Sequence, residues 1–297
     1  MKILLLGAAG QVGRELHRIL AAIGDIVAAT RNGRLEDGTA CEMADFDRLD
    51  SLPALIERIA PEVVVNAAAY TAVDRAEDEP EAAFHANAEA PAIIAQACAA
   101  RAALLVHYST DYVFDGQGTR AYREDDATAP LGAYGASKLA GEQAIARSGC
   151  RHLILRTAWV YAAHGSNFLR TMLRLAAERD ALRVVADQVG SPTPAWLIAD
   201  VTARLLHKPP QASGLWHLTA GGATSWHGFA EAIFAGAVER GLLARAPQVQ
   251  AIASAGYPTR AARPAWSVLD TAKLRRDFGV TLPEWNAALS RTLDQMV

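Results

Sequence analysis

The chain has 297 residues, of which 51% are hydrophobic and 21% charged, and its formal net charge is −3. This is ordinary globular composition, and the small net charge with scattered arginines gives no case for a nucleic-acid or membrane partner. The three cysteines, Cys41, Cys98 and Cys150, are too few and too irregular for a disulfide framework or a zinc site. No apolar run is long enough to cross a membrane, so we expect a cytoplasmic protein.

A strand, a glycine-rich turn and a helix are predicted at the start of the chain. Residues 2–6 form a short apolar run typical of a buried strand, and residues 14–22 have helical periodicity. The glycines between them are spaced G-x-x-G-x-x-G, which lets backbone N–H groups at a helix N-terminus approach a pyrophosphate. A simple turn is the alternative, but we predict a dinucleotide site. Its residues are Gly7, Gly10, Gln11, Val12 and Gly13.

The second predicted strand, residues 25–30, bears on the choice of cofactor. A carboxylate at the end of this strand usually holds the ribose 2′-hydroxyl, but here the strand ends with Thr30 and Arg31. Arg31 is suited to a 2′-phosphate, which favours NADPH over NADH, although a solvated loop arginine is the alternative. A short third strand is expected within residues 40–46, where Asp45 and Phe46 would border the adenine.

Strands and helices continue to alternate as far as residue 157. Helices are predicted at residues 48–60, 79–101 and 130–149, and strands at residues 62–66, 104–110 and 152–157. Six strands that alternate with helices indicate a Rossmann-type, doubly wound parallel sheet with helices on both faces. Ligands of such sheets bind at the carboxyl ends of the strands, where Ala67, Ala68 and Ala69 leave room for a cofactor.

Two residues of the predicted helix 79–101 need comment. Pro91 lies inside it and is expected to kink or break the helix, because proline lacks a backbone N–H. Asn87 either anchors a ligand or a water chain, or is an exposed polar residue.

Beyond residue 160 the alternation is less regular. Further elements are predicted at residues 166–179, 183–185, 196–207, 215–218, 226–240, 271–278 and 284–296, with a turn at 187–193. We expect a smaller C-terminal α/β lobe that covers the substrate. The predicted domains are therefore residues 1–160 for the cofactor and residues 161–297 mainly for the substrate, with the second able to return strands or helices to the first.

Tyr134 and Lys138 are four residues apart, so on one helix they share a face. A phenol is a poor acid near neutral pH, and a neighbouring ammonium lowers its pKa. Such a tyrosine can exchange a proton with a carbonyl or alcohol oxygen while the lysine holds a cofactor ribose. Thr110, or Ser109, ends a strand and would hydrogen-bond the substrate oxygen. Tyr-x-x-x-Lys alone is usually structural, but after a cofactor turn the set indicates hydride transfer.

Segments along nearly the whole chain resemble the dTDP-4-dehydrorhamnose reductase family of extended short-chain dehydrogenases/reductases. They are Gly10-Gln11-Val12-Gly13, Asn66-Ala67-Ala68-Ala69, Thr71-Ala72-Val73-Asp74, His107 to Phe114, Tyr134-Gly135 with Lys138 to Glu142, Arg156 to Tyr161, Asn167-Phe168, Asp187 to Thr193, His217-Leu218, Trp226-His227 and Arg263-Pro264. The resemblance implies reduction of the C4 ketone of dTDP-4-dehydro-L-rhamnose by NADPH or NADH, with Thr110, Tyr134 and Lys138 catalytic. It also implies contacts to the dTDP-sugar from Asp111, Trp159 and Arg263.

Tyr112 distinguishes this chain from related sugar-nucleotide dehydratases. Those relatives carry Asp-Glu after the threonine, and the glutamate abstracts a ring proton, whereas here Tyr112 follows Asp111. A 4,6-dehydratase would lack its base. A nucleotide-sugar 4-epimerase remains an alternative, and so does a non-catalytic regulatory subunit that binds NADP(H), which the intact Thr110, Tyr134 and Lys138 disfavour.

The resemblance also raises the question of a metal. Some members of the family hold Mg²⁺ between subunits through acidic residues, one of which matches Glu15. This chain has Trp196 where those members carry a second glutamate. We predict no metal, with Glu15 as the single candidate ligand and otherwise a solvated acid near a helix start. A monomer or a homodimer is compatible with the sequence, and His107 is expected in the core or on the surface rather than in catalysis.

Overall fold

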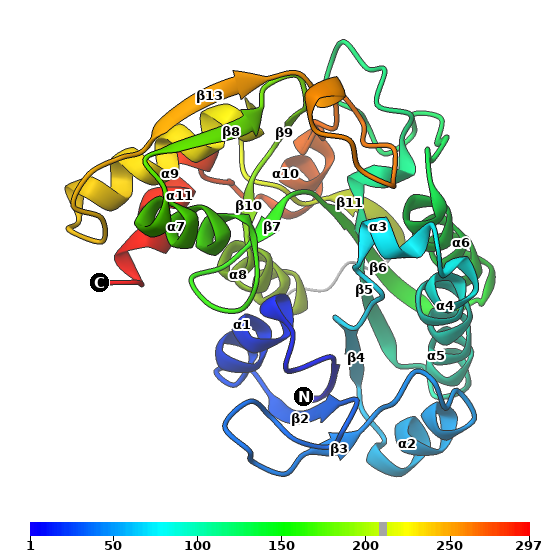
Figure 1. Cartoon of the computed structure of the whole chain (residues 1–297). Helices are drawn as coiled ribbons and strands as arrows, with labels where there is room; N and C mark the ends of the chain where they lie inside the picture. The colour runs from blue at the N-terminus through cyan, green and yellow to red at the C-terminus, as the bar shows by residue number, and fades with distance from the viewer. Residues whose placement is uncertain (208–212) are drawn as a thin grey trace.

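The computed structural model describes residues 1–207 and 213–297 and contains a seven-stranded sheet (Figure 1). Its strand order is β11-β6-β5-β4-β1-β2-β3, and every neighbouring pair is parallel. The strands are β1 (Lys2–Leu6), β2 (Asp25–Thr30), β3 (Glu42–Met43), β4 (Val63–Asn66), β5 (Leu104–Thr110), β6 (Arg151–Thr157) and β11 (Gly214–His217). The predicted Rossmann-type α/β fold is confirmed.

The two faces of the sheet are covered by different helices. These are α1 (Gln11–Leu20), α8 (Ala195–His207) and α10 (Ala272–Phe278) on one face, and α2 (Ser51–Ile59), α5 (Ala90–Ala100) and α6 (Ala133–Arg147) on the other. In β1, Ile3 and Leu5 point to the first group, whereas Leu4 and Leu6 point to the second. All four side chains are fully buried, which explains why the strand is an unbroken apolar run.

A smaller lobe gathers at the upper left of Figure 1. It contains α7 (Phe168–Glu178), β8 (Ala181–Val185), α9 (Trp226–Glu239), β13 (Gln248–Ile252) and α11 (Trp285–Asp294), with the short helix Ser254–Gly256 after β13. β13 pairs with β8 in parallel, and Leu169, Phe229 and Leu293 lie in its separate hydrophobic core. The lobe therefore has a core of its own, which its apolar helix faces bury.

The segment predicted as a turn at residues 187–193 instead enters two short ladders. β9 (Val189–Gly190) pairs with β12 (Thr224–Ser225), and β10 (Thr193–Pro194) pairs with β7 (Val160–Tyr161). The prediction of a simple turn is wrong, because these pairings join segments that lie about thirty residues away along the chain.

Two elements after residue 160 belong to the layers of the large sheet. β11 extends the sheet beside β6, from Gly214 opposite Leu153 to His217 opposite Arg156. α8 packs on α1, and both contribute to the core on that face. The C-terminal part of the chain therefore returns a strand and a helix to the sheet, and a domain boundary at residue 160 stays a prediction.

The predicted helix 79–101 is interrupted ahead of Pro91. It consists of α4 (Pro80–Phe84), a π-helical turn at His85–Glu89 and then α5, and α3 (Val73–Ala76) precedes it. Pro91 has no N–H for the regular α-helical bond, and a π turn is one way in which a helix accommodates such a gap. The helix is therefore irregular just before Pro91, but it continues through the π turn and does not break.

Asn87 lies in this π turn and is completely buried. Its amide accepts a hydrogen bond from the Tyr70 backbone N–H at 2.9 Å and donates to the Tyr70 carbonyl at 3.0 Å and to the Ser137 hydroxyl at 3.1 Å. The alternative of an exposed residue is wrong, because these contacts with the protein occupy the amide.

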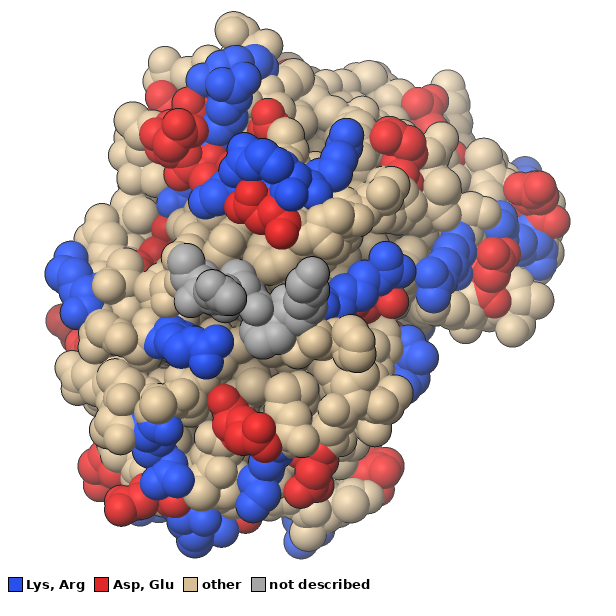
Figure 2. All heavy atoms as spheres, turned by 180° about the vertical axis from the view of Figure 1, so that it is seen from behind, with Lys and Arg blue, Asp and Glu red and all other residues tan. Residues whose placement is uncertain are grey.

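The surface carries both signs of charge. On the face in Figure 2, Lys and Arg side chains alternate with Asp and Glu. Among residues 1–207 and 213–297, no helix combines the length and the apolar character needed to span a membrane.

Candidate active site

A cleft of about 970 Å³ lies at the carboxyl ends of β1, β2, β4, β5 and β6. Most residues of the predicted site line it: Gly7, Gly10, Gln11, Val12, Thr30, Arg31, Phe46, Ala67, Ala68, Ala69, Thr110, Asp111, Tyr134, Lys138 and Trp159. Gly13, Asp45 and Arg263 do not line it. The glycine turn and the stretch from Thr110 to Lys138, about a hundred residues apart in the sequence, therefore face one cavity.

The glycine turn is closely packed against its surroundings. Gly7 has a φ of +78°, and a Cβ there would lie 2.6 Å from the backbone nitrogen of Ala68. A Cβ on Gly13 would lie 2.0 Å from the carbonyl oxygen of Gly7. Because Gly13 has no side chain, α1 can pack directly against the glycine turn. The helix begins after Gly10, which has no side chain to cap it, so its first N–H groups can bind an anion.

Arg31 follows β2 and lines the cleft. Its guanidinium lies 3.5 Å from Asp45 and 3.6 Å from Asp47, and its side chain is 73% exposed. These contacts are long and open to solvent, so they hold the arginine only weakly. Asp45 does not line the cleft itself but contacts Arg31, which does. The hydroxyl of Thr30 donates to the Arg34 carbonyl at 2.9 Å and shapes the following turn.

Thr110 and Tyr134 come together from β5 and α6. Burial raises the pKa of the Tyr134 phenol to about 12, and the Thr110 hydroxyl beside it offsets only part of this rise. The predicted lowering of this pKa by Lys138 is wrong for the cofactor-free protein. Lys138 instead donates its Nζ proton to the Tyr108 carbonyl at 2.6 Å. Tyr134 is therefore a protonated phenol at neutral pH.

Asp111 is 2% exposed and begins the short helix Asp111–Val113. Its Oδ1 accepts a hydrogen bond of 3.0 Å from the Thr110 hydroxyl, and burial raises its pKa to about 6. Its Oδ2 is buried and makes no hydrogen bond of regular geometry within the described residues, although the Ser267 hydroxyl interacts with the carboxyl and lowers its pKa. A buried acceptor without a partner is costly, and at the edge of this cleft a ligand hydroxyl is suited to fill the gap.

Trp159 forms an aromatic wall of the cleft. Its ring stacks on Trp226 with centroids 3.5 Å apart and planes 2° apart, and its φ of +48° is unusual for a bulky residue. Gly190 makes room for the ring, because a Cβ there would lie 2.5 Å from the indole. Arg263, also expected at the substrate, forms a two-bond ion pair with Asp74 at 2.9 and 3.0 Å and does not line the cleft.

Some residues of the cleft were missed in the sequence. Tyr70, Thr71 and Arg75 line it directly after the three alanines, so the same argument from strand ends could have been extended to them. Asn167 also lines it and donates to the Gln11 side chain at 2.9 Å. No local signal pointed to Asn167, because Gln11 precedes it by 156 residues.

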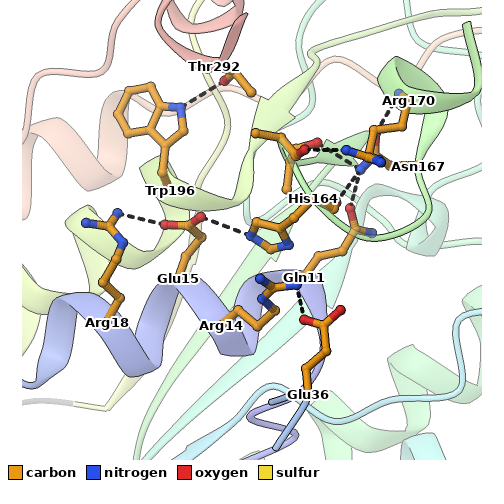
Figure 3. A network of polar contacts seen from close by, with 12 residues as sticks. Gln11, Arg14, Glu15, Arg18, Glu36, His164, Asn167, Arg170, Trp196 and Thr292 are labelled. Atoms are coloured by element: carbon orange, nitrogen blue, oxygen red, sulfur yellow. Dashed lines mark hydrogen bonds and ion pairs between the residues drawn. The ribbon is translucent and has the colours of Figure 1, made fainter. Parts of the chain in front are cut away.

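Figure 3 shows why Glu15 does not fit a metal site. One carboxylate oxygen accepts from Arg18 at 2.8 Å, and the other lies 3.0 Å from Nε2 of His164. Glu15 is only 7% exposed, so the alternative of a solvated acid is wrong. Trp196 donates its indole N–H to Thr292 at 3.0 Å and offers no ligand. Within residues 1–207 and 213–297, no cluster of three or more His, Cys, Asp or Glu side chains could hold a metal.

Comparisons with known proteins cover the whole chain. A family model described as the RmlD substrate binding domain matches residues 1–297. A dTDP-4-dehydrorhamnose reductase of Burkholderia thailandensis is 48% identical over 298 residues, which cover 97% of both chains. That of Salmonella typhimurium is 45% identical over 299 residues, 100% of this chain and 98% of the relative. A crystal structure of dTDP-4-dehydrorhamnose reductase from Bacillus anthracis in complex with NADP has a TM-score of 0.90 at 32% identity and covers 99% of both chains.

These matches agree with the resemblance seen in the sequence and with the cleft that unites the glycine turn, Thr110, Tyr134 and Lys138. The chain belongs to the dTDP-4-dehydrorhamnose reductase family.

Proposed function

We propose that the protein reduces the C4 ketone of dTDP-4-dehydro-L-rhamnose to dTDP-L-rhamnose with NADPH, the last step of dTDP-rhamnose biosynthesis. The observation that carries this proposal is the single cleft that holds the glycine turn together with Thr110, Tyr134 and Lys138. Membership of the family supplies the substrate class, and the relative from Bacillus anthracis was solved with NADP.

The cleft fits a dinucleotide. Gly7 and Gly13 leave space that any Cβ would fill, and the uncapped start of α1 offers N–H groups to a pyrophosphate. Arg31 would contact a 2′-phosphate, and the exposure of its side chain leaves it free to turn toward one. NADPH, when bound, supplies the hydride. NADH is the alternative donor, and Arg31 is the feature that favours NADPH.

Tyr134 is suited to be the proton donor. A phenol carries its proton at neutral pH, and burial raises the pKa of Tyr134 further; an acid must carry its proton when the C4 oxygen gains negative charge. The hydroxyl of Thr110 lies between Asp111 and this phenol, and by turning its single proton from Asp111 to the same oxygen it would hold that oxygen in place. Lys138 would hold the ribose of the nicotinamide. Each of these effects contributes roughly 10²-fold or more to the rate.

The substrate side of the cleft suits a hexose. Oδ2 of Asp111 is a buried acceptor that a sugar hydroxyl can satisfy, and the flat face of Trp159 can pack against a sugar ring. Arg263 is committed to Asp74 and would reach the sugar nucleotide only by leaving that pair. We therefore assign it a secondary role in binding the substrate.

The roles of the two parts of the chain and its location in the cell are proposals as well. Residues 1–160 would bind the cofactor and residues 161–297 mainly the sugar nucleotide, with β11 and α8 returned to the cofactor half. The cytoplasm is the expected location, because the three cysteines are all unpaired thiols.

The test is incubation of the protein with dTDP-4-dehydro-L-rhamnose and NADPH while absorbance at 340 nm is followed. The proposal predicts a substrate-dependent loss of absorbance and dTDP-L-rhamnose as product. A 4-epimerase would interconvert sugar nucleotides without net consumption of NADPH. A regulatory subunit would bind NADPH but consume none, and either outcome would refute the proposal.

A further inference from the structure

Asp47 brings a negative charge to the wall of the cleft beside Arg31. It lines the cleft together with Thr30, Arg31 and Phe46, and its side chain is 70% exposed. β2 and β3 are parallel neighbours, with Thr30 opposite Met43. Arg31 follows the end of one strand and Asp47 the end of the other. Both therefore lie at the edge of the sheet where a dinucleotide binds.

A short turn holds Asp47 in this place. Oδ1 of Asp45 accepts a hydrogen bond of 3.2 Å from the backbone N–H of Asp47, and the carbonyl of Asp45 accepts one of 3.0 Å from the backbone N–H of Arg48. The side chain of Asp45 is thus engaged in the turn, which is a common use of aspartate. The carboxylate of Asp47 takes no part in it. Its ion-pair partner within residues 1–207 and 213–297 is Arg31, with 3.6 Å between Oδ2 and Nη2.

Two carboxylates oppose the single guanidinium of Arg31. It pairs with Asp45 at 3.5 Å and with Asp47 at 3.6 Å, so one positive charge faces two negative ones. A 2′-phosphate carries nearly two negative charges at neutral pH. It would be attracted by Arg31 and repelled by the carboxylates, whereas a ribose 2′-hydroxyl has no charge to be repelled.

Of the two carboxylates, Asp47 is the one that a bound nucleotide meets. Asp45 does not line the cleft, and its side chain is held by the turn. The pair between Arg31 and Asp47 is exposed and long, so little free energy is lost when Arg31 turns from it to a phosphate. The charge of Asp47 stays at the wall of the cleft after this movement. Its repulsion of the phosphate therefore persists in the complex.

We propose that Asp47 is a specificity-determining residue: its carboxylate at the wall of the cleft opposes the attraction of Arg31 for a 2′-phosphate and so narrows the preference for NADPH over NADH. This inference rests on the proposed function in one respect, that the cofactor is a nicotinamide dinucleotide. It assigns the choice between the two nucleotides to a pair of opposite charges rather than to Arg31 alone.

Binding of the two nucleotides tests this role without any substrate. Isothermal titration gives the dissociation constants of NADPH and NADH for wild type and for Asp47→Asn, which removes the charge and keeps the shape. We expect the variant to bind NADPH about three- to tenfold more tightly, because one negative charge near the phosphate is lost, and to keep its affinity for NADH within about twofold. Unchanged or weaker binding of NADPH, or an equal gain for both nucleotides, would overturn the proposal.

Two further variants separate charge from shape. Asp47→Glu restores the carboxylate and should keep the wild-type ratio of the two dissociation constants. Asp50→Asn removes an exposed acid that does not line the cleft and should leave the ratio unchanged. The gain in Asp47→Asn should also shrink as salt is raised from about 0.02 to about 0.5 M, since exposed charges are screened. A gain that salt does not reduce would mean altered packing and would overturn the proposal.

The outcome can be told apart from that of the proposed reaction, because neither a sugar nucleotide nor turnover is involved. A wild-type protein that binds both nucleotides but leaves dTDP-4-dehydro-L-rhamnose unreduced would refute the reaction, and the comparison with Asp47→Asn would still decide the role of Asp47. A wild-type protein that binds neither nucleotide would overturn both.

Discussion

The hydroxyl of Thr110 donates a hydrogen bond of 3.0 Å to Oδ1 of Asp111, where β5 ends at the cleft. The same hydroxyl oxygen accepts from the backbone N–H of Tyr112 at 3.2 Å. The threonine is therefore fixed by the two residues that follow it, one of them a buried carboxyl. Its position beside Tyr134 thus depends on the state of Asp111.

Asp111 should make stability fall as pH rises. Its folded pKa of about 6 lies above the ordinary 3.8, so between these values the folded protein binds more protons than the unfolded chain. The contribution to stability is fully present below pH 3.8 and is lost up to about pH 6. We expect the difference in unfolding free energy between wild type and Asp111→Asn to shrink by about 2 to 3 kcal/mol across this window.

Urea unfolding at several pH values measures this difference. Asp115→Asn is the control, because the Tyr122 hydroxyl lowers the pKa of Asp115 and reverses the sign. A difference between wild type and Asp111→Asn that stays constant or grows with pH would show that the pKa of Asp111 is not raised in the folded protein.

Tyr134→Phe removes the proposed acid and leaves the ring. We expect turnover to fall by at least about 10²-fold, while the affinity for NADPH, measured by fluorescence titration, changes little. Tyr112→Phe is the matched control, because its ring contacts that of Tyr134 edge-on at 5.6 Å and it should keep most of the turnover. Full activity of Tyr134→Phe would remove this residue from the mechanism.

Arg31→Ala tests the preference for NADPH. Loss of a guanidinium–phosphate contact should weaken NADPH binding by about tenfold, whereas NADH should be affected far less. Isothermal titration with both nucleotides gives the two ratios. Arg48→Ala, which removes a nearby exposed arginine, should change neither. Equal losses for both nucleotides in Arg31→Ala would contradict a phosphate contact.

Magnesium should be dispensable. Both carboxylate oxygens of Glu15 are engaged by Arg18 and His164, and a cation would have to break these contacts. We expect treatment with EDTA to leave turnover unchanged and millimolar Mg²⁺ to leave the melting temperature unchanged. A loss of activity on chelation that Mg²⁺ restores would mean that the ion uses ligands other than this arrangement.

The sequence predicted the sheet well because its strands are buried on both faces. β1, β2 and β5 have the bounds predicted for them, 2–6, 25–30 and 104–110. The short β9 and β10 were missed, since each is two residues long and exists through pairing with a distant segment. Local patterns carry no information on such pairings.

Site residues could be predicted from the sequence where their position at a strand end or on a helix face determines where they lie. Thr110 ends a strand and Tyr134 and Lys138 share a helix face, so their meeting at the cleft followed from topology. The pKa of Tyr134 was not predictable, because burial and the contact between Lys138 and Tyr108 arise only on folding.

The most direct test of the central claim uses NADPH deuterated at its transferable hydrogen. The protein should convert dTDP-4-dehydro-L-rhamnose to dTDP-L-rhamnose that carries one deuterium at C4, seen by mass spectrometry and nuclear magnetic resonance. Product without deuterium at C4, or consumption of NADPH that does not depend on the sugar nucleotide, would contradict reduction at this carbon by the cleft of Thr110, Tyr134 and Lys138.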